Sequence, residues 1–114
     1  MKVIIAGSRS ITEYTTVVSA FQEWPYDECT MIVSGGARGV DKLGERIAKE
    51  WHLPIAIFTP NWDELGKRAG MLRNIQMAHF AEGLIAVWDG KSKGTKHMID
   101  TMTNLGKPVF TCIK

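Results

Sequence analysis

The chain has 114 residues, of which 45% are hydrophobic and 23% charged, with a formal net charge of +2 at pH 7. This length and composition are typical of one globular domain with its own core, and they exclude a low-complexity chain. The mild positive balance does not indicate a nucleic-acid surface. No apolar run is long enough to cross a membrane.

The cysteines and histidines follow no metal-binding or redox spacing. We therefore expect no metal, no cofactor and no disulfide, and we expect Cys112 to be buried in an apolar run. The first seven residues, MKVIIAG, hold too short an apolar run for a signal peptide. These features predict a cytoplasmic protein without membrane contact.

Five apolar runs predict strands at residues 2–6, 30–33, 55–59, 83–87 and 108–112. Their nearly continuous apolar character is typical of parallel strands that are covered on both faces. Helices are predicted between them, after a capping box formed by Ser10 and Glu13, and at about 40–51, 66–81 and 95–106. Asn61 is a candidate cap for the segment before the third long helix.

Alternation of strands and helices predicts one α/β domain over residues 1–114, with a five-stranded parallel sheet in the order 3-2-1-4-5. In such a sheet, ligands bind beyond the carboxyl ends of the strands, where the direction of winding reverses. Strands 1 and 4 lie at that point. Functional residues are therefore expected directly after strands 1, 2 and 4.

Each of these three positions carries a short glycine-bearing turn with basic residues, reading GSR, SGGARGVD and WDGKSKGTK. Backbone amides and the helix dipole at such turns bind anions. With the polar residues of the third long helix, the turns give the candidate ligand-binding set: Gly7, Ser8, Arg9, Ser34, Gly35, Gly36, Arg38, Gly39, Asp41, Arg68, Arg73, Asn74, Asp89, Gly90, Lys91, Ser92, Gly94 and Thr95.

The usual nucleotide fingerprints are missing, because neither GxxxxGK[ST] nor a GxGxxG after strand 1 occurs. Asp41 and Asp89 are the candidate acid–base residues. Asp41 also has structural explanations, as a first-turn carboxylate or as a partner of Arg38. Trp62 offers an aromatic face to a base or packs against the sheet edge.

Four motifs in order, GSR, SGGARGVD, NWxxxGKRAGMLRNIQM and WDGKSKGTKHMI, resemble the SLOG superfamily, and in particular its small YspA-like, YpsA-related domains. SGGARGVD is similar to the SGLARGID turn of DNA-processing protein A, which binds single-stranded DNA. The stretch from Arg73 to Thr95 is similar to the LOG phosphoribohydrolases, which cleave the base–ribose bond of nucleoside monophosphates.

The resemblance implies that Arg73 matches the nucleotide-binding arginine of those enzymes and that Gly94 and Thr95 match the GT of their PGGxGTxxE loop. Met98 stands where their catalytic glutamate lies, and a methionine cannot relay a proton. The resemblance thus favours the nucleotide pocket over the known hydrolase chemistry.

Three functions stay open from the sequence. The first is a module that senses or sequesters a nucleotide or an ADP-ribose-like molecule. The second is a hydrolase of the LOG type, and the third, less favoured, is single-stranded DNA binding, which usually needs an extended basic groove with stacking aromatics. A homo-oligomer is also expected. Met71, Met77, Met98 and Met102 are candidates for a dimer face, or alternatively for the core.

Overall fold

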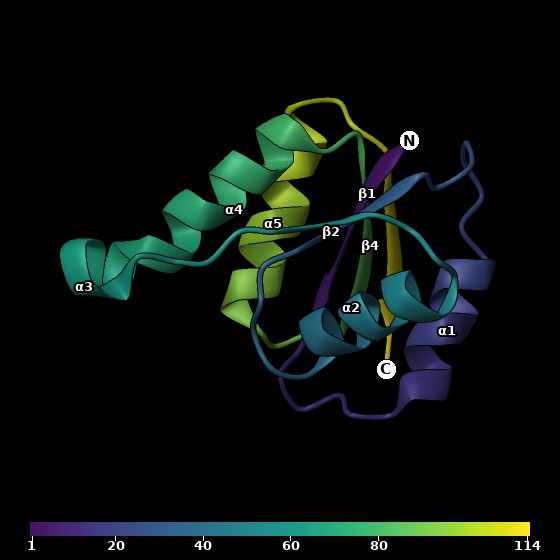
Figure 1. Cartoon of the computed structure of the whole chain (residues 1–114). Coiled ribbons are helices and arrows are strands. Elements are labelled where there is room, and N and C mark those ends of the chain that lie inside the picture. Colours follow the sequence, from purple (N-terminus) through teal and green to yellow (C-terminus); the bar gives the residue numbers. More distant parts are fainter.

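The computed structural model describes residues 1–114, except for the side chain of Lys67. Helices cover both faces of a central sheet (Figure 1). In chain order the elements are β1 (Lys2–Gly7), α1 (Tyr14–Gln22), β2 (Met31–Ser34), α2 (Val40–Glu50), β3 (Ile55–Ile57), α3 (Trp62–Leu65), the 3-10 turn η1 (Gly66–Arg68), α4 (Ala69–Phe80), β4 (Gly83–Trp88), α5 (Lys93–Asn104) and β5 (Val109–Ile113).

The sheet has the predicted five strands in the predicted order, β3-β2-β1-β4-β5, and every neighbouring pair is parallel. β1 lies at the centre, so the winding reverses between β1 and β4. This confirms the Rossmann-like α/β fold. It also brings the carboxyl ends of β1, β2 and β4 together at one end of the sheet, the lower end in Figure 1. This end is called here the carboxyl edge of the sheet.

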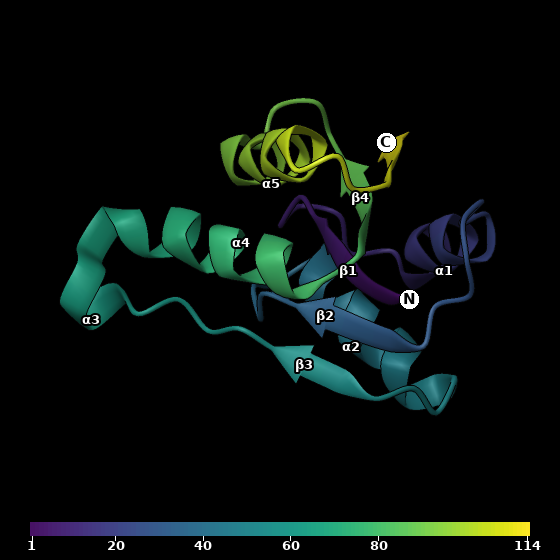
Figure 2. The same cartoon turned by 90° about the horizontal axis from the view of Figure 1, so that it is seen from above.

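The core forms two layers because successive side chains of a strand point to opposite faces. Val3 and Ile5 of β1 belong to a buried cluster with residues of α1 and α2. Ile4 and Ala6 belong to a second cluster with Met77 of α4 and residues of α5. Figure 2 shows the two helix pairs on opposite sides of the sheet. Burial on both faces explains the continuous apolar runs of the central strands.

The side chains of the two edge strands, β3 and β5, are more exposed to solvent than their apolar sequences predicted. Ile55 and Ile57 of β3 are 40% and 51% exposed. β3 is also shorter than the predicted 55–59, because its sheet partner β2 ends at Ser34 and the chain then leaves the sheet toward α3 (Figure 2). In β5, Cys112 is only partly buried, which corrects the expectation of a buried residue; it and Cys29 are free thiols.

The predicted helix over 66–81 starts as a 3-10 turn and becomes an α-helix only at Ala69. The segment before it forms the short helix α3, and the side chain of Asn61 accepts a hydrogen bond from the Glu64 amide at 3.3 Å, which confirms the predicted cap. The 3-10 turn η1 then leads into α4. Figures 1 and 2 show α3 and the start of α4 projecting beyond the sheet.

The predicted capping box of Ser10 and Glu13 is wrong. α1 begins at Tyr14, so Glu13 occupies the cap position itself, and no side chain caps the helix. A capping box needs the serine at the cap and the glutamate three residues inside the helix. The chain after β1 instead stays irregular up to Glu13.

Three of the four methionines proposed for a dimer face belong to the core. Met77, Met98 and Met102 are at most 1% exposed and pack between α4, α5 and the sheet. Met71 alone is on the surface, at 55% exposure. Self-association therefore stays a prediction, without these three residues as its interface.

No helix in the described part of the chain combines the length and apolar character needed to span a bilayer. Among the described residues, no three His, Cys, Asp or Glu side chains gather in a way that could hold a metal ion.

Candidate functional site

The three predicted turns meet at the carboxyl edge of the sheet, with the β1 turn in the middle. The Ser8 hydroxyl accepts a hydrogen bond from the amide of Asp89, after β4, at 2.9 Å. The Ser8 carbonyl accepts one from the amide of Val40, at the start of α2, at 3.4 Å. Ser8 is 1% exposed. Ser8 therefore connects the turn after β1 to the turns after β2 and β4, and its buried side chain does not face a ligand.

Gly39 brings the β2–α2 turn against the β1 turn. Its φ of 75° favours glycine, and a Cβ atom there would lie 2.6 Å from the carbonyl oxygen of Ser8. Backbone therefore packs on backbone at this point. Any other residue at position 39 would push the two turns apart.

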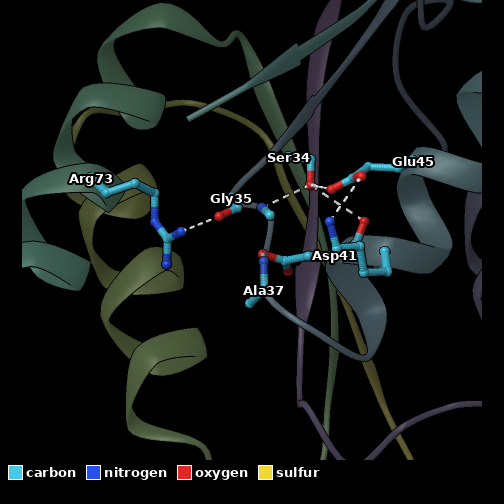
Figure 3. Close-up of polar contacts among 8 residues, drawn as sticks. Ser34, Gly35, Ala37, Asp41, Glu45 and Arg73 are labelled. Carbon is cyan, nitrogen blue, oxygen red and sulfur yellow. Dashed lines mark hydrogen bonds and ion pairs between the residues drawn. The ribbon is translucent and has the colours of Figure 1, made fainter. Parts of the chain in front are cut away.

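The Ser34 hydroxyl holds the start of the SGGARGVD turn. It donates to the Glu45 carboxylate at 2.7 Å and accepts from the Gly36 amide at 3.1 Å. Figure 3 shows this cluster between the end of β2 and the α2 helix. Ser34 is fully buried, so its role is to shape the turn.

The turn after β4 is organised by Asp89. Its Oδ1 atom accepts hydrogen bonds from the amides of Lys91 and Ser92 at 2.8 and 2.9 Å, and these bonds hold the pKa of the carboxyl below its usual range. The Ser92 hydroxyl in turn caps α5 by accepting from the Thr95 amide at 3.4 Å. Asp89 thus closes a turn, which is a structural role for this candidate acid.

Arg73 reaches from α4 across the edge of the sheet. Its Nη1 atom donates to the backbone carbonyl of Gly35 (Figure 3). The same atom lies 3.5 Å from the backbone carbonyl of Phe58. A Cβ atom on Gly35 would lie 2.6 Å from Nη1 and 2.8 Å from Oδ2 of Asp41. Gly35 therefore leaves room for the guanidinium and the carboxylate to approach the same point from two helices.

Asn74 connects Arg73 to the start of α5. Its Oδ1 atom accepts from Nε of Arg73 at 3.0 Å, and its amide nitrogen donates to the Gly94 carbonyl at 3.2 Å. The same nitrogen lies 3.2 Å from Nδ1 of His97. With 5% exposure, Asn74 fixes both the arginine and the spacing of the two helices.

Arg73, Asn74 and Asp41 line a small cavity of about 80 Å³, called here the inner pocket. It lies between the β1 turn, α4 and the first turn of α5. Its lining consists of Ala6, Gly7, Arg9, Ala37, Asp41, Arg73, Asn74, Met77, Ser92, Gly94, Thr95 and Met98.

A second cavity of about 330 Å³, the outer pocket, lies between the β2–α2 turn and the chain that leads from β3 to α3. Its lining consists of Arg9, Gly35, Gly36, Ala37, Lys42, Ile57, Thr59, Pro60, Trp62 and Arg73. Arg9, Ala37 and Arg73 line both pockets, so the two cavities adjoin at these residues.

The charges at this junction are mostly positive. Burial lowers the pKa of Arg73, and the nearby charge of Arg9 lowers it further, while Asp41 raises it. The ion pairs of the described part of the chain, Lys42–Glu45, Arg46–Glu50 and Lys96–Asp100, involve neither Arg9 nor Arg73. Arg9 and Arg73 therefore both line one cavity, with Asp41 as its lining carboxyl group.

Asp41 is 5% exposed. Burial raises the pKa of its carboxyl to about 6, against the opposing effects of a hydrogen bond from the Ala37 amide at 3.2 Å and of the Arg73 charge. The group therefore titrates about one pH unit below neutrality and is mostly ionised at pH 7, where its single negative charge offsets only one of the two arginines. Arg73 approaches Asp41 in place of the expected Arg38, which is exposed and lines neither pocket.

The predicted ligand-binding residues divide into two groups. Those that line a pocket are Gly7, Arg9, Gly35, Gly36, Asp41, Arg73, Asn74, Ser92, Gly94 and Thr95. Those that lie outside both linings are Ser8, Ser34, Arg38, Gly39, Arg68, Asp89, Gly90 and Lys91. Several of the second group instead shape the turns.

The outer pocket has apolar walls that lie outside the predicted ligand-binding set, namely Ile57, Pro60 and Trp62. Of these the sequence points only to Trp62, as an aromatic face for a base, and its 50% exposure separates it from a core residue. Met98 lines the inner pocket.

A comparison with known proteins finds the gene 61 protein of Mycobacterium phage D29, which is 34% identical to this chain over 119 aligned positions. The alignment covers 96% of this chain and 94% of the phage protein. The chain belongs to the family of this phage protein. No protein-family model matches the chain, and no solved structure matches it.

Proposed function

We propose that the chain binds a phosphate-bearing, nucleotide-derived small molecule at the carboxyl edge of the sheet, with its phosphate in the inner pocket. The observation that carries this proposal is that Arg9 and Arg73 both line one cavity in which Asp41 is the lining carboxyl group. Arg73 is partly buried and feels the charge of Arg9, and two neighbouring positive charges repel each other unless an anion lies between them.

The start of α5 supports the same ligand class. The amides of the first helical turn point away from the helix, and the dipole gives this end a partial positive charge. Gly94 lines the inner pocket, and a Cβ atom at this position would meet no atom within 4 Å. An anionic oxygen can therefore approach the backbone closely here.

The size of the cavities favours a small molecule over a polymer. The inner pocket, at about 80 Å³, admits a group such as phosphate, and the outer pocket, at about 330 Å³, lies at the lower end of the range for small-molecule sites. Single-stranded DNA binding would instead use an extended basic groove. Asp41 lines the inner pocket, where a sugar hydroxyl next to the phosphate could donate to it.

Titration calorimetry with the four common nucleoside monophosphates tests the proposal. Arg73→Ala should weaken binding of the best ligand at least tenfold, since a charge-assisted hydrogen bond contributes roughly 1.5–3 kcal/mol. Arg38→Ala is the matched control, because Arg38 is exposed on the same turn but lines neither pocket. If Arg73→Ala binds as tightly as the unmodified protein, the proposed pocket is wrong.

A hydrolase of the LOG type is the second candidate, and Asp41 favours it. A buried carboxyl group whose pKa is raised to about 6 is suited to exchange a proton near neutral pH. Chromatography for released base, after incubation with each nucleoside monophosphate, tests this activity. Turnover that disappears in Asp41→Asn supports it, whereas no release from any of the four leaves only the binding function.

A further inference from the structure

We infer that the outer pocket receives the planar base of the ligand and that Trp62 is the aromatic surface on which this base stacks. The inference rests on the proposed function, since it extends the phosphate site of the inner pocket by a second subsite. It makes the ligand a nucleotide with its base still attached, in place of a sugar phosphate or a free anion.

The first argument is the chemical character of the outer pocket. Two of its apolar walls, Ile57 and Trp62, are 51% and 50% exposed, and Pro60 lies between them in sequence. Large apolar side chains that gather on a concave surface are a common mark of a ligand site. Arg9 and Arg73 lie in the same lining, so the cavity joins an apolar surface to a cationic one. An aromatic group attached to an anion has this combination.

The second argument is the placement of Trp62. It is the first residue of α3, the short helix capped by Asn61, which projects beyond the sheet (Figures 1 and 2). A Cβ atom on Gly70 of α4 would lie 3.4 Å from the six-membered ring of Trp62. The Cη2 edge of the ring thus lies beside Gly70, which has no side chain to displace it, while Trp62 stays 50% exposed. Such an indole offers a stacking surface with little conformational freedom to lose on binding.

The third argument is the continuity of the two cavities. Arg9, Ala37 and Arg73 line both, so a ligand can occupy both around the Arg73 guanidinium. Neither cavity alone accounts for a nucleotide, because the inner pocket is too small for a base and the start of α5, at Gly94 and Thr95, lines the inner pocket only. Phosphate in the inner pocket and base in the outer pocket place the sugar at the shared residues.

Calorimetric titration with adenosine, guanosine, cytidine and uridine 5′-monophosphate, and with ribose 5-phosphate, tests the inference on the full chain. Ribose 5-phosphate carries the phosphate and the sugar but no base. At least one nucleotide should bind ten times more tightly than ribose 5-phosphate. Trp62→Ala should remove most of this difference, because stacking of one base on an aromatic side chain changes affinity by roughly 5- to 150-fold.

Trp62→Phe is the conservative variant and should retain much of the difference, since it keeps an aromatic face at the same place. Trp62 is half exposed, so both variants should fold, which thermal unfolding verifies. If the nucleotides and ribose 5-phosphate bind equally well and Trp62→Ala changes neither, the base subsite is refuted while the phosphate site stands. If none of the five probes binds, both proposals fail.

Discussion

The guanidinium of Arg73, carried by α4, donates a hydrogen bond to the backbone carbonyl of Gly35 at the end of β2 (Figure 3). This contact joins residues 38 positions apart in the sequence. It ties α4 to the turn after β2, beside the inner pocket that Arg73 lines. It depends on the missing side chain of Gly35, because Arg73 and Asp41 fill the space in which a Cβ atom would lie.

Gly35→Ala is therefore expected to displace the Arg73 guanidinium and to weaken nucleoside monophosphate binding about tenfold, as measured by calorimetry. The flexible arginine can move aside, so the protein should still fold. A double-mutant cycle provides the control, because two changes that act through the same contact are not additive. In an Arg73→Ala background, Gly35→Ala should have little further effect on affinity. If the effects of Gly35→Ala and Arg73→Ala on affinity add up fully in the double variant, Gly35 does not act through Arg73.

Asp41 predicts an unusual pH dependence of stability. Its pKa is about 6 in the folded protein and 3.8 without the fold, so between these values the native state binds more protons than the unfolded state. The free energy of unfolding should therefore fall as the pH rises from about 4 to 7. About two pKa units correspond to a contribution of about 3 kcal/mol. Urea titrations across this range measure it.

Asp41→Asn isolates this contribution, because an amide oxygen can still accept the Ala37 hydrogen bond and does not titrate. The variant should lose the downward trend and be more stable than the unmodified protein at pH 7. Identical pH profiles for the two proteins would mean that Asp41 titrates normally in the fold.

Ser8→Ala should destabilise the protein by roughly 1–3 kcal/mol, because it leaves the Asp89 amide without its buried partner and loosens the turns after β1 and β4. Chemical denaturation measures the change. Ser10→Ala is the matched control. Ser10 is exposed and lies outside α1, so its substitution should alter stability by less than about 0.5 kcal/mol. A comparable loss of stability in Ser8→Ala and Ser10→Ala would contradict the role of Ser8 as the buried partner of the Asp89 amide.

Lys107 satisfies the end of α4. Its Nζ atom donates to the carbonyls of Ala78 and Ala81 at 2.7 and 2.8 Å, where a positive charge also complements the helix dipole. Lys107→Met should lower the unfolding free energy by about 1–2 kcal/mol. Lys96→Met removes an exposed i,i+4 pair with Asp100 and should cost less than about 0.5 kcal/mol. Thermal unfolding of both variants compares them, and equal losses would refute the capping role.

Much of the fold follows from local patterns. The apolar runs, the alternation with helices and the rule of right-handed crossovers were sufficient for the strand order that the structure shows. The wrong predictions concern the starts of helices, which depend on tertiary contacts as well as on the local sequence. Ser10 and Glu13 have the residue types of a capping box, but α1 begins only at Tyr14. The segment 66–81 has helical character, yet its start bends at η1.

The sequence by itself determined that three glycine-bearing turns and an arginine-bearing helix lie at one edge of the sheet, because residue order and the period of apolar positions specify which turn follows which strand. Only the tertiary structure decided which of their side chains face a cavity. Ser8, Ser34 and Asp89 are bound to turn amides, whereas Arg73 and Asp41 converge on the inner pocket. That distinction depends on atoms far apart in the chain competing for the same space and hydrogen bonds, which no local pattern encodes.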